Sequence, residues 1–491
     1  MFTLFTFLLA CQTFYVYNVH MVAARMNPAP VSPDLTNLLW TRDLTREHGF
    51  EPLEIEGALP ASLSGTLYRN GPGQFGQFGK RYSHPFEGDG ALTAIRFEGG
   101  RVTGASKLTQ SAGLLEERAA GKILFGSAAP WHRRVAGGLS GKQKNTANTN
   151  VIVWQGRVLA LMEAAKPTEL DARDLHTIGE TDLGAITSMF SAHPHRVASR
   201  KALYNFGLQY GRKTMLHLYE LPDVGAARHL GAVELPGPTM LHDFIATDTH
   251  LVFFISPVRV SVPRLLLQLG GLEDFFRWKP EHGTEILCVP IDRPTEPVRI
   301  KTEAFYQWHF ANARDEGNWI VVDYVRYPSF DTFYEIGGMV TGTGRDALAP
   351  GRYHRATIDL AARTFSDERI LDHSCEFPTI APGVQGRAHA FTYLSLDDLH
   401  GIGKLDIATG RLDAHALPQT QRATEPLFVA NGPGEDDGHV LSLCADGPSD
   451  RAFVAVYDAK RIAAGPVAKV WLDHSLPITF HGTFDRGTVS T

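Results

Sequence analysis

TMLHDFIATDTHLVFF (239–254) has the pattern of a turn followed by two strands, with His242 at the head of the first strand. After His242 the residues alternate and then become continuously apolar, which is typical of a strand pair with one buried face. The same order of histidine, polar turn and apolar strand recurs in SAHPHRVASRKALYNFGL (191–208) and QWHFANARDEGNWIVVDYV (307–325). A single histidine in such a position is a core residue by default, but three in one phase indicate a shared centre.

From about residue 50 onward the rest of the chain has an all-β pattern. Short apolar runs alternate with turns rich in Gly, Asp, Asn and Pro, and helical periodicity is found mainly in 111–124 and 262–276. Hairpins of one kind recur roughly every 50–70 residues, which is typical of a β-propeller built from four-stranded blades. These hairpins are ELPDVGAARHLGAVEL, TIDLAARTFSDERIL, KLDIATGRLDAHAL and VYDAKRIAAGPVAKVWL. We predict a single β-propeller domain over residues 31–491, because no linker-like segment divides it.

A propeller gives the recurring histidines a common geometry. The innermost strand of every blade runs beside the central axis, so residues at equivalent starts of successive inner strands converge there. His193, His242 and His309 would then approach one point from neighbouring blades. A fourth histidine, His481 in PITFHGTFD (477–485), would complete the ring.

Other histidines compete for this role. His195 lies two residues from His193, but strand alternation would turn it to the opposite face. His84, in SHPFEGDG, has similar surroundings, although the Gly-rich sequence after it indicates a turn. The chain contains 21 histidines, so the alternative for each candidate is an ordinary core or surface histidine that lies near a strand start by chance.

Four converging imidazoles suit a transition metal such as iron, zinc, copper or nickel. Neutral histidines leave the charge of a divalent ion unbalanced, and ligating histidines usually donate their second ring N–H to a carboxylate. Three glutamates in strongly apolar surroundings are candidates for that role: Glu163 in LALMEAAKP, Glu376 in CEFPTIAP and Glu425 in TEPLFVA. Four protein ligands on an octahedral ion leave two positions open, which suits dioxygen chemistry at iron(II) better than a closed structural zinc site.

Composition excludes several classes of protein. Hydrophobic residues make up 43% of the chain and charged residues 20%, so it can bury a sizeable core and is not disordered. The net charge of −6 argues against a nucleic-acid partner, which usually calls for a basic surface. The four cysteines are far apart, which predicts no disulfide framework, no thiolate metal site and a reducing compartment such as the cytoplasm.

The N-terminal lead, residues 1–30, is open to three interpretations. Its first 20 residues are strongly apolar and contain no Lys, Arg, Asp or Glu. The lead is an artefact of the chosen start, since Met21 and Met26 both precede ordinary sequence, or it is a membrane anchor, or it is a signal segment. LLAC (8–11) loosely resembles a lipoprotein cleavage box, whereas the positive region of a signal peptide is absent.

From about residue 50 to the end, the chain resembles the carotenoid cleavage oxygenase family. The motifs that carry the resemblance are, in the family's order, GALPASLSGTLYRNGPG (57–73), HPFEGDGALTAIRF (84–97), KNTANTNV (144–151), ALMEAAKPTEL (160–170), SAHPH, LHDF, WHFANA, CEFP, EPLFV and HGTF. Within the family the chain is most similar to the bacterial apocarotenoid oxygenases. It departs from the family pattern at Glu87, Met162 and Trp308, where relatives often have aspartate, tryptophan and histidine.

The resemblance implies a seven-bladed β-propeller with a few helices and loops capping the active-site face, and one Fe²⁺ per chain on the axis. The family's four metal ligands fall on His193, His242, His309 and His481. Its glutamates behind those ligands fall on Glu163, Glu376 and Glu425. Thr149 matches a family threonine whose methyl group crowds an open coordination position.

The implied reaction is oxidative cleavage of a polyene C=C bond by O₂ to give two aldehydes or ketones. The implied substrate is an apolar apocarotenoid or carotenoid, with retinal as one candidate product. Stilbene cleavage is an alternative, which is disfavoured because Met162 stands where stilbene-cleaving relatives tend to carry a lysine. A propeller that only binds a carotenoid is a second alternative, although no motif here is degenerate.

A polyene substrate would come from a membrane, and residues 260–276 are the candidate for peripheral contact with one. This segment combines an apolar stretch with Arg259 and Arg264, as interfacial segments do. The alternative is an ordinary helix that packs on the propeller.

Overall fold

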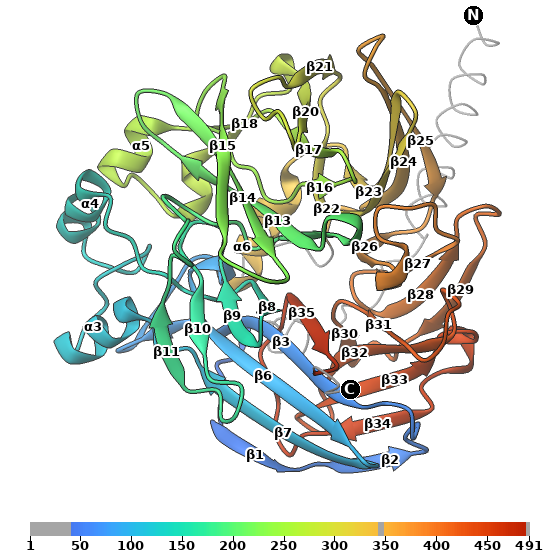
Figure 1. Cartoon of the computed structure of the whole chain (residues 1–491). Helices are drawn as coiled ribbons and strands as arrows, with labels where there is room; N and C mark the ends of the chain where they lie inside the picture. The colour runs from blue at the N-terminus through green and yellow to red at the C-terminus, as the bar shows by residue number, and fades with distance from the viewer. Residues whose placement is uncertain (1–40, 342–347, 488–491) are drawn as a thin grey trace, which may run out of the picture.

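Seven sheets are arranged around a central axis in the computed structural model, which describes residues 41–341 and 348–487 (Figure 1). The predicted all-β, seven-bladed propeller is confirmed. The apolar lead at residues 1–30 lies outside the described residues. The second to sixth blades follow the chain in order, so strand colour in Figure 1 progresses around the ring.

The first sheet has the order β1-β7-β6-β3-β35 and contains β1 (His48–Pro52), β3 (Gly65–Gln74), β6 (Asp89–Glu98), β7 (Arg101–Leu108) and β35 (His481–Asp485). The second contains β8 (Asn150–Trp154), β9 (Arg157–Leu161), β10 (Thr168–Leu170) and β11 (Thr177–Glu180). The third contains β12 (His195–Val197), β13 (Ala202–Gln209), β14 (Thr214–Pro222) and β15 (Arg228–Leu235).

The next three sheets also have four strands each. The fourth contains β16 (Ile245–Ala246), β17 (His250–Ile255), β20 (Thr284–Pro290) and β21 (Val298–Thr302). The fifth contains β22 (Tyr306–Glu316), β23 (Trp319–Tyr327), β24 (Arg352–Asp359) and β25 (Thr364–Leu371). The sixth contains β26 (Cys375–Thr379), β27 (Phe391–Leu396), β28 (Gly401–Asp406) and β29 (Leu412–Ala416).

The last sheet joins strands from the two ends of the chain. It contains β30 (Gln421–Ala423), β31 (Leu427–Ala430), β32 (Gly438–Asp446), β33 (Arg451–Asp458), β34 (Ala468–Trp471) and β2 (Glu54–Gly57). In turn, C-terminal β35 pairs with β3 of the first sheet, with His481 opposite Asn70. The ring is therefore closed twice, and the second closure carries His481 to the axis.

Two short ribbons and several helices lie outside the blades. The ribbons pair β4 (Gly76–Gln77) with β5 (Lys80–Arg81), and β18 (Val258–Val260) with β19 (Phe276–Trp278). The α-helices are α3 (Ala112–Ala120), α4 (Trp131–Ser140), α5 (Val262–Leu267) and α6 (Asp331–Thr341). Single 3₁₀ turns are η1 (Pro85–Glu87), η2 (Ala198–Arg200), η3 (Leu272–Phe275), η4 (Pro280–His282), η5 (Pro382–Val384) and η6 (Ile462–Ala464).

The helical segments follow local signals only in part. Helix α3 forms within 111–124 as expected, because the Ser111 side chain accepts the Leu114 N–H and Gly121 ends the helix with a φ of 61°. The expected helix over 262–276 is broken into α5 and η3, since Gly270 between them has a φ of +107°. Helices α4 and α6 were not predicted. No helix among the described residues is long and apolar enough to cross a membrane.

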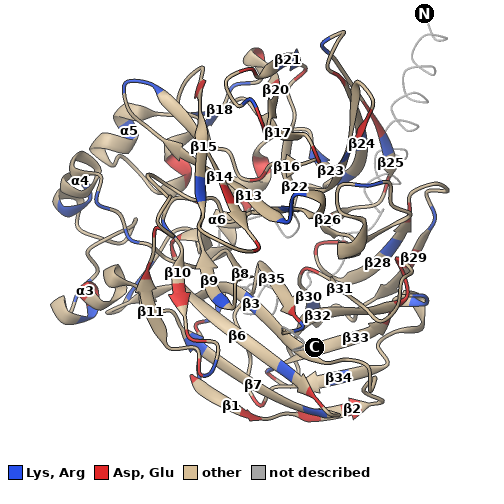
Figure 2. Cartoon of the chain, in the orientation of Figure 1, with Lys and Arg blue, Asp and Glu red and all other residues tan. Residues whose placement is uncertain are grey.

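Apolar side chains fill the spaces between neighbouring blades. Phe244 and Phe253 stack with centroids 5.1 Å apart, and Phe206 of the previous blade meets both edge-on. The run LVFFI (251–255) is apolar throughout because both faces of β17 are buried. Charged residues of both signs are interspersed over the blades and loops, with neither sign collected on one side (Figure 2).

Candidate metal centre

One end of the axis gathers one side chain from the start of each inner strand. The seven residues are Thr149 before β8, His193 before β12, His242 before β16, His309 in β22, Glu376 in β26, Glu425 between β30 and β31, and His481 at the start of β35. The blades of a propeller place equivalent positions around the axis. The sequence therefore repeats a site position once per blade while varying the side chain there.

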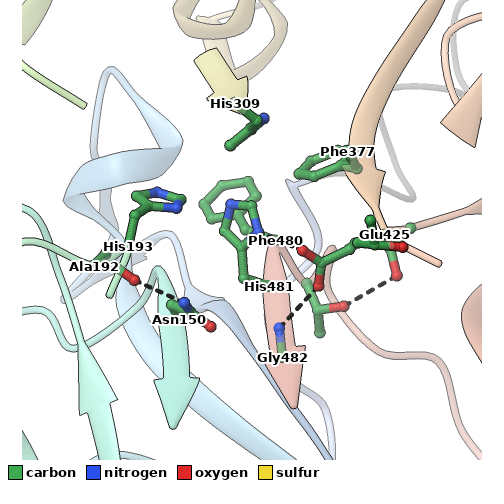
Figure 3. A network of polar contacts seen from close by, with 12 residues as sticks. Asn150, Ala192, His193, His309, Phe377, Glu425, Phe480, His481 and Gly482 are labelled. Atoms are coloured by element: carbon green, nitrogen blue, oxygen red, sulfur yellow. Dashed lines mark hydrogen bonds and ion pairs between the residues drawn. The ribbon is translucent and has the colours of Figure 1, made fainter. Parts of the chain in front are cut away.

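Four of these residues are histidines, and the structure brings them together. Their ring nitrogens offer a set of ligand atoms that all lie within 4.8 Å of one another. Figure 3 places His193, His309 and His481 around one small space. The four side chains are held away from solvent, since their residues are only 5–9% exposed. The members of the set are His193, His242, His309 and His481.

Two of the predicted glutamates bind histidines of this set directly. His309 Nδ1 lies 2.6 Å from Glu376 Oε2, and His481 Nδ1 lies 2.8 Å from Glu425 Oε1. Glu425 is fixed further by the Gly482 N–H, which donates to Oε2 at 3.0 Å (Figure 3). A carboxylate that accepts the Nδ1 proton leaves Nε2 unprotonated and turned inward.

Glu163 follows β9 and stands between the other two histidines. Its Oε1 lies 3.1 Å from His242 Nδ1 and 3.3 Å from His193 Nε2. Burial by itself would raise the pKa of Glu163, but the neighbouring His242 and His193 outweigh burial and lower the pKa to about 2. Glu163 is therefore ionised, and His193 differs from the other three histidines by turning Nε2 toward its carboxylate.

The arrangement of nitrogens fits a bound cation. His242 Nε2 and His309 Nε2 face each other at 3.2 Å, while the Nδ1 atom of each ring faces a glutamate. Two unprotonated nitrogens so placed repel each other unless a positive charge lies beside both. Neighbouring ligands on one ion, at metal–nitrogen distances of about 2.1 Å, are about 3 Å apart. Burial and the other three histidines lower the pKa of His481 well below its usual range, so this ring is neutral and able to bind a metal.

A buried guanidinium offsets part of the negative charge at the site. Arg69 of β3 is fully buried and donates from Nη1 to Glu425 Oε2 at 2.7 Å. Burial raises the pKa of Glu425, and pairing with Arg69 opposes that shift. The carboxylates behind the histidines thus outnumber this guanidinium. A bound cation would offset the remaining negative charge, which relieves the cost of burying it.

The two competing histidines have other partners. His195 Nε2 binds Asp243 Oδ1 at 2.8 Å, and Asp243 also accepts the N–H groups of Phe244 and Phe310. Asp243 thus joins neighbouring inner strands and turns away from the histidine set. His84 is completely buried, accepts the Phe86 N–H through Nδ1 and contacts the Phe333 carbonyl through Nε2 at 3.2 Å. It is a core histidine with both nitrogens satisfied.

A cavity adjoins the histidines. His242, His309 and His481 form part of its wall, together with Thr149 and Glu376. Most of the other lining is apolar, a combination typical of a site for a large apolar ligand. The apolar lining residues are Phe86, Trp308, Ile336, Leu348, Ala349, Phe377, Leu399 and Phe480.

Thr149 and Met162 lie at this wall or just behind it. The Thr149 hydroxyl donates to Asn148 Oδ1 at 3.1 Å, and the Asn148 amide donates to the carbonyls of Phe86 and Gly88. The hydroxyl is thus held by the protein. Met162 accepts weak contacts from the Thr146 N–H and hydroxyl at its sulfur, at 3.2 and 3.4 Å.

Sequence reasoning did not predict the contacts of several residues that shape the site. Tyr327 donates its hydroxyl to Glu376 Oε1 at 2.9 Å, which fixes the carboxylate behind His309. Trp308 meets His242 edge-on with centroids 4.8 Å apart and donates Nε1–H to Thr332 at 2.7 Å. Tyr327 ends a second strand of its blade and Thr332 belongs to α6, so neither shares the sequence phase of the histidines.

Comparisons with known proteins identify relatives over almost the whole described chain. The model of the family described as retinal pigment epithelial membrane protein matches residues 41–486. The chain is 33% identical over 460 residues to the apocarotenoid-15,15'-oxygenase of Synechocystis, which covers 88% of this chain and 92% of that protein. It is 29% identical over 458 residues to the isoeugenol monooxygenase of Pseudomonas nitroreducens, covering 88% and 93% of the two chains.

The structural comparison agrees. A cobalt-substituted apocarotenoid oxygenase from Synechocystis superimposes with a TM-score of 0.83 at 31% identity, covering 92% of this chain and 98% of that one. The relatives named above are oxygenases. This chain therefore belongs to the retinal pigment epithelial membrane protein family, that of the carotenoid cleavage oxygenases, and is an oxidoreductase of that family.

Proposed function

We propose that this protein is an iron(II) dioxygenase that cleaves a C=C bond of an apocarotenoid or carotenoid with O₂. The observation that carries the proposal is the set of four buried imidazoles, backed by three glutamates, in the wall of an apolar cavity. Histidines alone as protein ligands leave open positions on an octahedral ion, as oxygen chemistry at iron requires. The cobalt-substituted relative holds a metal, which supports the same role for these histidines.

The residues that would hold the ion are His193, His242, His309 and His481. Iron(II), when bound there, supplies the redox chemistry that activates dioxygen. Glu376 and Glu425 hold His309 and His481 in the tautomer whose inward nitrogen carries a lone pair. Tyr327 and Arg69 hold those glutamates in turn.

The remaining task of the protein is to position the substrate and exclude water. Addition of both atoms of O₂ across a C=C bond, with cleavage to two carbonyl groups, consumes and releases no proton. The site therefore needs no general acid or base, and none is assigned. Apolar walls such as Phe86, Phe377 and Phe480 fit a polyene and keep it beside the histidines.

Our first choice of substrate is an apocarotenoid, which would be cleaved to retinal or a related aldehyde. The reason is that the relative in Synechocystis is named as an apocarotenoid-15,15'-oxygenase. A phenylpropenoid is the second, because another relative of similar coverage is named for isoeugenol. Met162 offers no cation to a phenol, which favours the apocarotenoid.

Product analysis tests the proposal. Iron-loaded protein is incubated in air with an apocarotenal, with isoeugenol and with a stilbene, and the products are identified by chromatography and mass spectrometry. We expect two carbonyl products from the apocarotenal. Cleavage of isoeugenol alone would move the assignment to phenylpropenoids, and no cleavage of any of the three would contradict the proposal.

We also infer peripheral membrane contact through α5 and neighbouring α4. Exposed apolar side chains cluster on these helices and the loop after α5, and the Trp131 Nε1–H donates to the Leu267 carbonyl at 3.1 Å to join them. The exposed apolar residues are Trp131, Leu139, Val262, Leu266, Leu267 and Leu269. Of the two basic residues expected to flank the patch, Arg264 is exposed, whereas Arg259 is half-buried and donates to the Ser256 and Val258 carbonyls.

A further inference from the structure

The loop between β27 and β28 has an unusual backbone where it reaches the cavity. Asp397, Asp398 and Leu399 have φ values of 49°, 55° and 69°. Three consecutive residues with side chains in the left-handed region are uncommon, because each brings its Cβ close to the following carbonyl oxygen. Such a conformation persists only where the surroundings impose it, and it is often found at functional sites.

Neighbouring segments hold this loop in place at several points. The Asp397 N–H donates to the Ser374 carbonyl at 3.1 Å, and the Ala423 N–H donates to the Leu399 carbonyl at 2.8 Å. Arg422 donates from Nη1 to the Asp398 carbonyl at 2.6 Å. The strained loop is therefore fixed both by the segment before β26 of its own blade and by β30 of the next blade, and its side chains have defined positions.

Several polar residues in the cavity wall have hydrogen-bond partners within the protein. Thr332 accepts from Trp308, Tyr327 donates to Glu376, and the Ser395 hydroxyl donates to the Thr424 carbonyl at 3.0 Å. Asp398 also lines the cavity, and its Oδ2 lies 3.3 Å from Arg422 Nη1.

The other carboxylate oxygen of Asp398, Oδ1, is buried and has no hydrogen-bond partner among the described residues. A buried carboxylate oxygen without a donor is costly, and such groups in native structures call for a partner. Burial raises the pKa of Asp398, and Arg422 opposes that shift. Asp398 lines the cavity, so a rotation of its carboxylate would bring this oxygen to a donor on a ligand there.

We propose that Asp398 is a specificity-determining residue, which accepts a hydrogen bond from a hydroxyl group at the end of the conjugated substrate. This inference rests on the proposed function, since it takes the cavity beside the histidines as the substrate site. A hydroxyl can donate to Oδ1, whereas an aldehyde carbonyl is only an acceptor. The substrate therefore lies with its hydroxyl-bearing end at Asp398 and with any aldehyde end away from it.

Two kinds of molecule offer this chemistry. One is a polyene with a hydroxylated end ring, and the other is a phenol that carries a conjugated side chain. The shared feature is a hydroxyl donor on an otherwise apolar, conjugated molecule. Matched pairs that differ only in this hydroxyl separate the two sources.

Equilibrium binding provides a test that does not depend on turnover. The full-length protein is titrated with an apocarotenal and its ring-hydroxylated counterpart, and binding is followed as quenching of tryptophan fluorescence, since Trp308 lines the cavity. Isoeugenol and its methyl ether are compared by their displacement of the bound polyene. The quantity measured is the ratio of the two Kd values within each pair.

The substitutions at Asp398 are ones that a backbone with positive φ tolerates. Asp398→Gly removes the side chain at a position whose positive φ glycine adopts freely, and Asp398→Asn keeps the shape in a residue that tolerates the left-handed region. The control is Asp397→Asn on the same loop, because Asp397 is exposed and binds the exposed His373 at 2.9 Å.

We expect the wild-type protein to bind the hydroxylated member of at least one pair about tenfold or more tightly, as a hydrogen bond to a charged acceptor allows. Asp398→Gly should remove this preference, Asp398→Asn should reduce it, and Asp397→Asn should leave it as in the wild type. A preference in the apocarotenal pair identifies the ligand as a hydroxylated polyene, and a preference in the isoeugenol pair identifies it as a phenol. A wild-type ratio below about twofold in both pairs, or a ratio unchanged in Asp398→Gly, would overturn the proposal.

Cleavage assays on the same substrates keep the two proposals apart. Cleavage without any preference for the hydroxyl contradicts the role of Asp398 and leaves the dioxygenase proposal standing. The opposite outcome is that the wild-type protein prefers the hydroxylated ligand and Asp398→Gly loses this preference, while the iron-loaded protein cleaves none of the substrates. That outcome supports the role of Asp398 and contradicts the dioxygenase proposal.

Discussion

His242 faces a different partner with each of its ring nitrogens. Nδ1 lies 3.1 Å from Glu163, and Nε2 lies 3.2 Å from His309. His309 and His481 repeat the pattern, with Nδ1 on a glutamate and Nε2 free to turn inward. Each carboxylate thereby selects the tautomer of its histidine and contributes the negative charge that a divalent ion requires.

Two histidines two residues apart test this account at the residue scale. His193→Ala removes one of four proposed ligands, and we expect purified protein to retain less than about a tenth of the wild-type metal content. His195→Gln changes a side chain that binds Asp243 outside the set, so metal should be retained. Metal content is measured by mass spectrometry after anaerobic purification. Equal metal loss in both variants, or loss in His195→Gln alone, would show that the ligand is assigned to the wrong residue.

Part of the site is predictable from sequence because it repeats. The four histidines, Glu376 and Glu425 all lie at the start of an inner strand, and the signal recurs from blade to blade. Glu163 is found differently, as a carboxylate in apolar surroundings, because an isolated buried charge is costly. Tyr327 and Asp398 lie on a second strand and on a loop, where nothing in the local pattern indicates that they reach the axis.

At the scale of secondary-structure elements, closure of the ring forms the fourth proposed ligand position. His481 reaches the axis only because β35 pairs with β3, the strand that also carries Arg69. Arg69 in turn donates to Glu425, to the Thr424 hydroxyl and to the Phe480 carbonyl. The closure and the site are thus held by one buried guanidinium.

Removal of this guanidinium should be costly. We expect Arg69→Met to lower the free energy of unfolding by about 3–5 kcal/mol, because it leaves Glu425 buried without its cation. Arg451→Met is the control, since Arg451 joins the other closure through a partly exposed pair with Glu54 and should cost about 1 kcal/mol or less. Both values come from urea unfolding of metal-free protein. Similar losses in the two variants would contradict a special role for Arg69.

The elements themselves were predicted unevenly, for physical reasons. The recurring hairpins proved to be the outer strand pairs of three blades and the pair β33–β34 of the seventh, because the acid–turn–strand pattern is a local signal. The pairing of β2 with β34 joins segments more than 400 residues apart and leaves no local trace. Helix α4 contains the glycine pair 137–138, which weakens its helical pattern.

At the scale of the whole molecule, the cavity beside the histidines and the exposed apolar helices fit delivery of the proposed apolar substrate from a membrane. Helices α4 and α5 lie together at one side of the ring in Figure 1. Large apolar side chains exposed in a cluster usually mark a surface that binds a partner. The partner that matches the proposed apolar substrate is a bilayer surface.

Substitutions on α5 test membrane contact. Leu266→Glu combined with Leu267→Glu places two charges on side chains that are 40% and 47% exposed, so folding should be preserved. We expect binding to liposomes to fall at least about fivefold in a flotation assay, since a charge opposes insertion. Val224→Glu changes an apolar side chain that is 88% exposed in the turn after β14, and it should leave binding unchanged. Unchanged flotation of the double variant would exclude α5 as the contact.

The central claim is that the four histidines hold one catalytic iron. The most direct measurement is the metal content of anaerobically purified protein, determined together with its apocarotenal cleavage rate after stepwise removal and return of Fe²⁺. We predict about one iron per chain at full activity, and activity that rises in proportion to bound iron. Full activity in protein that contains only zinc, or no metal, would contradict the claim.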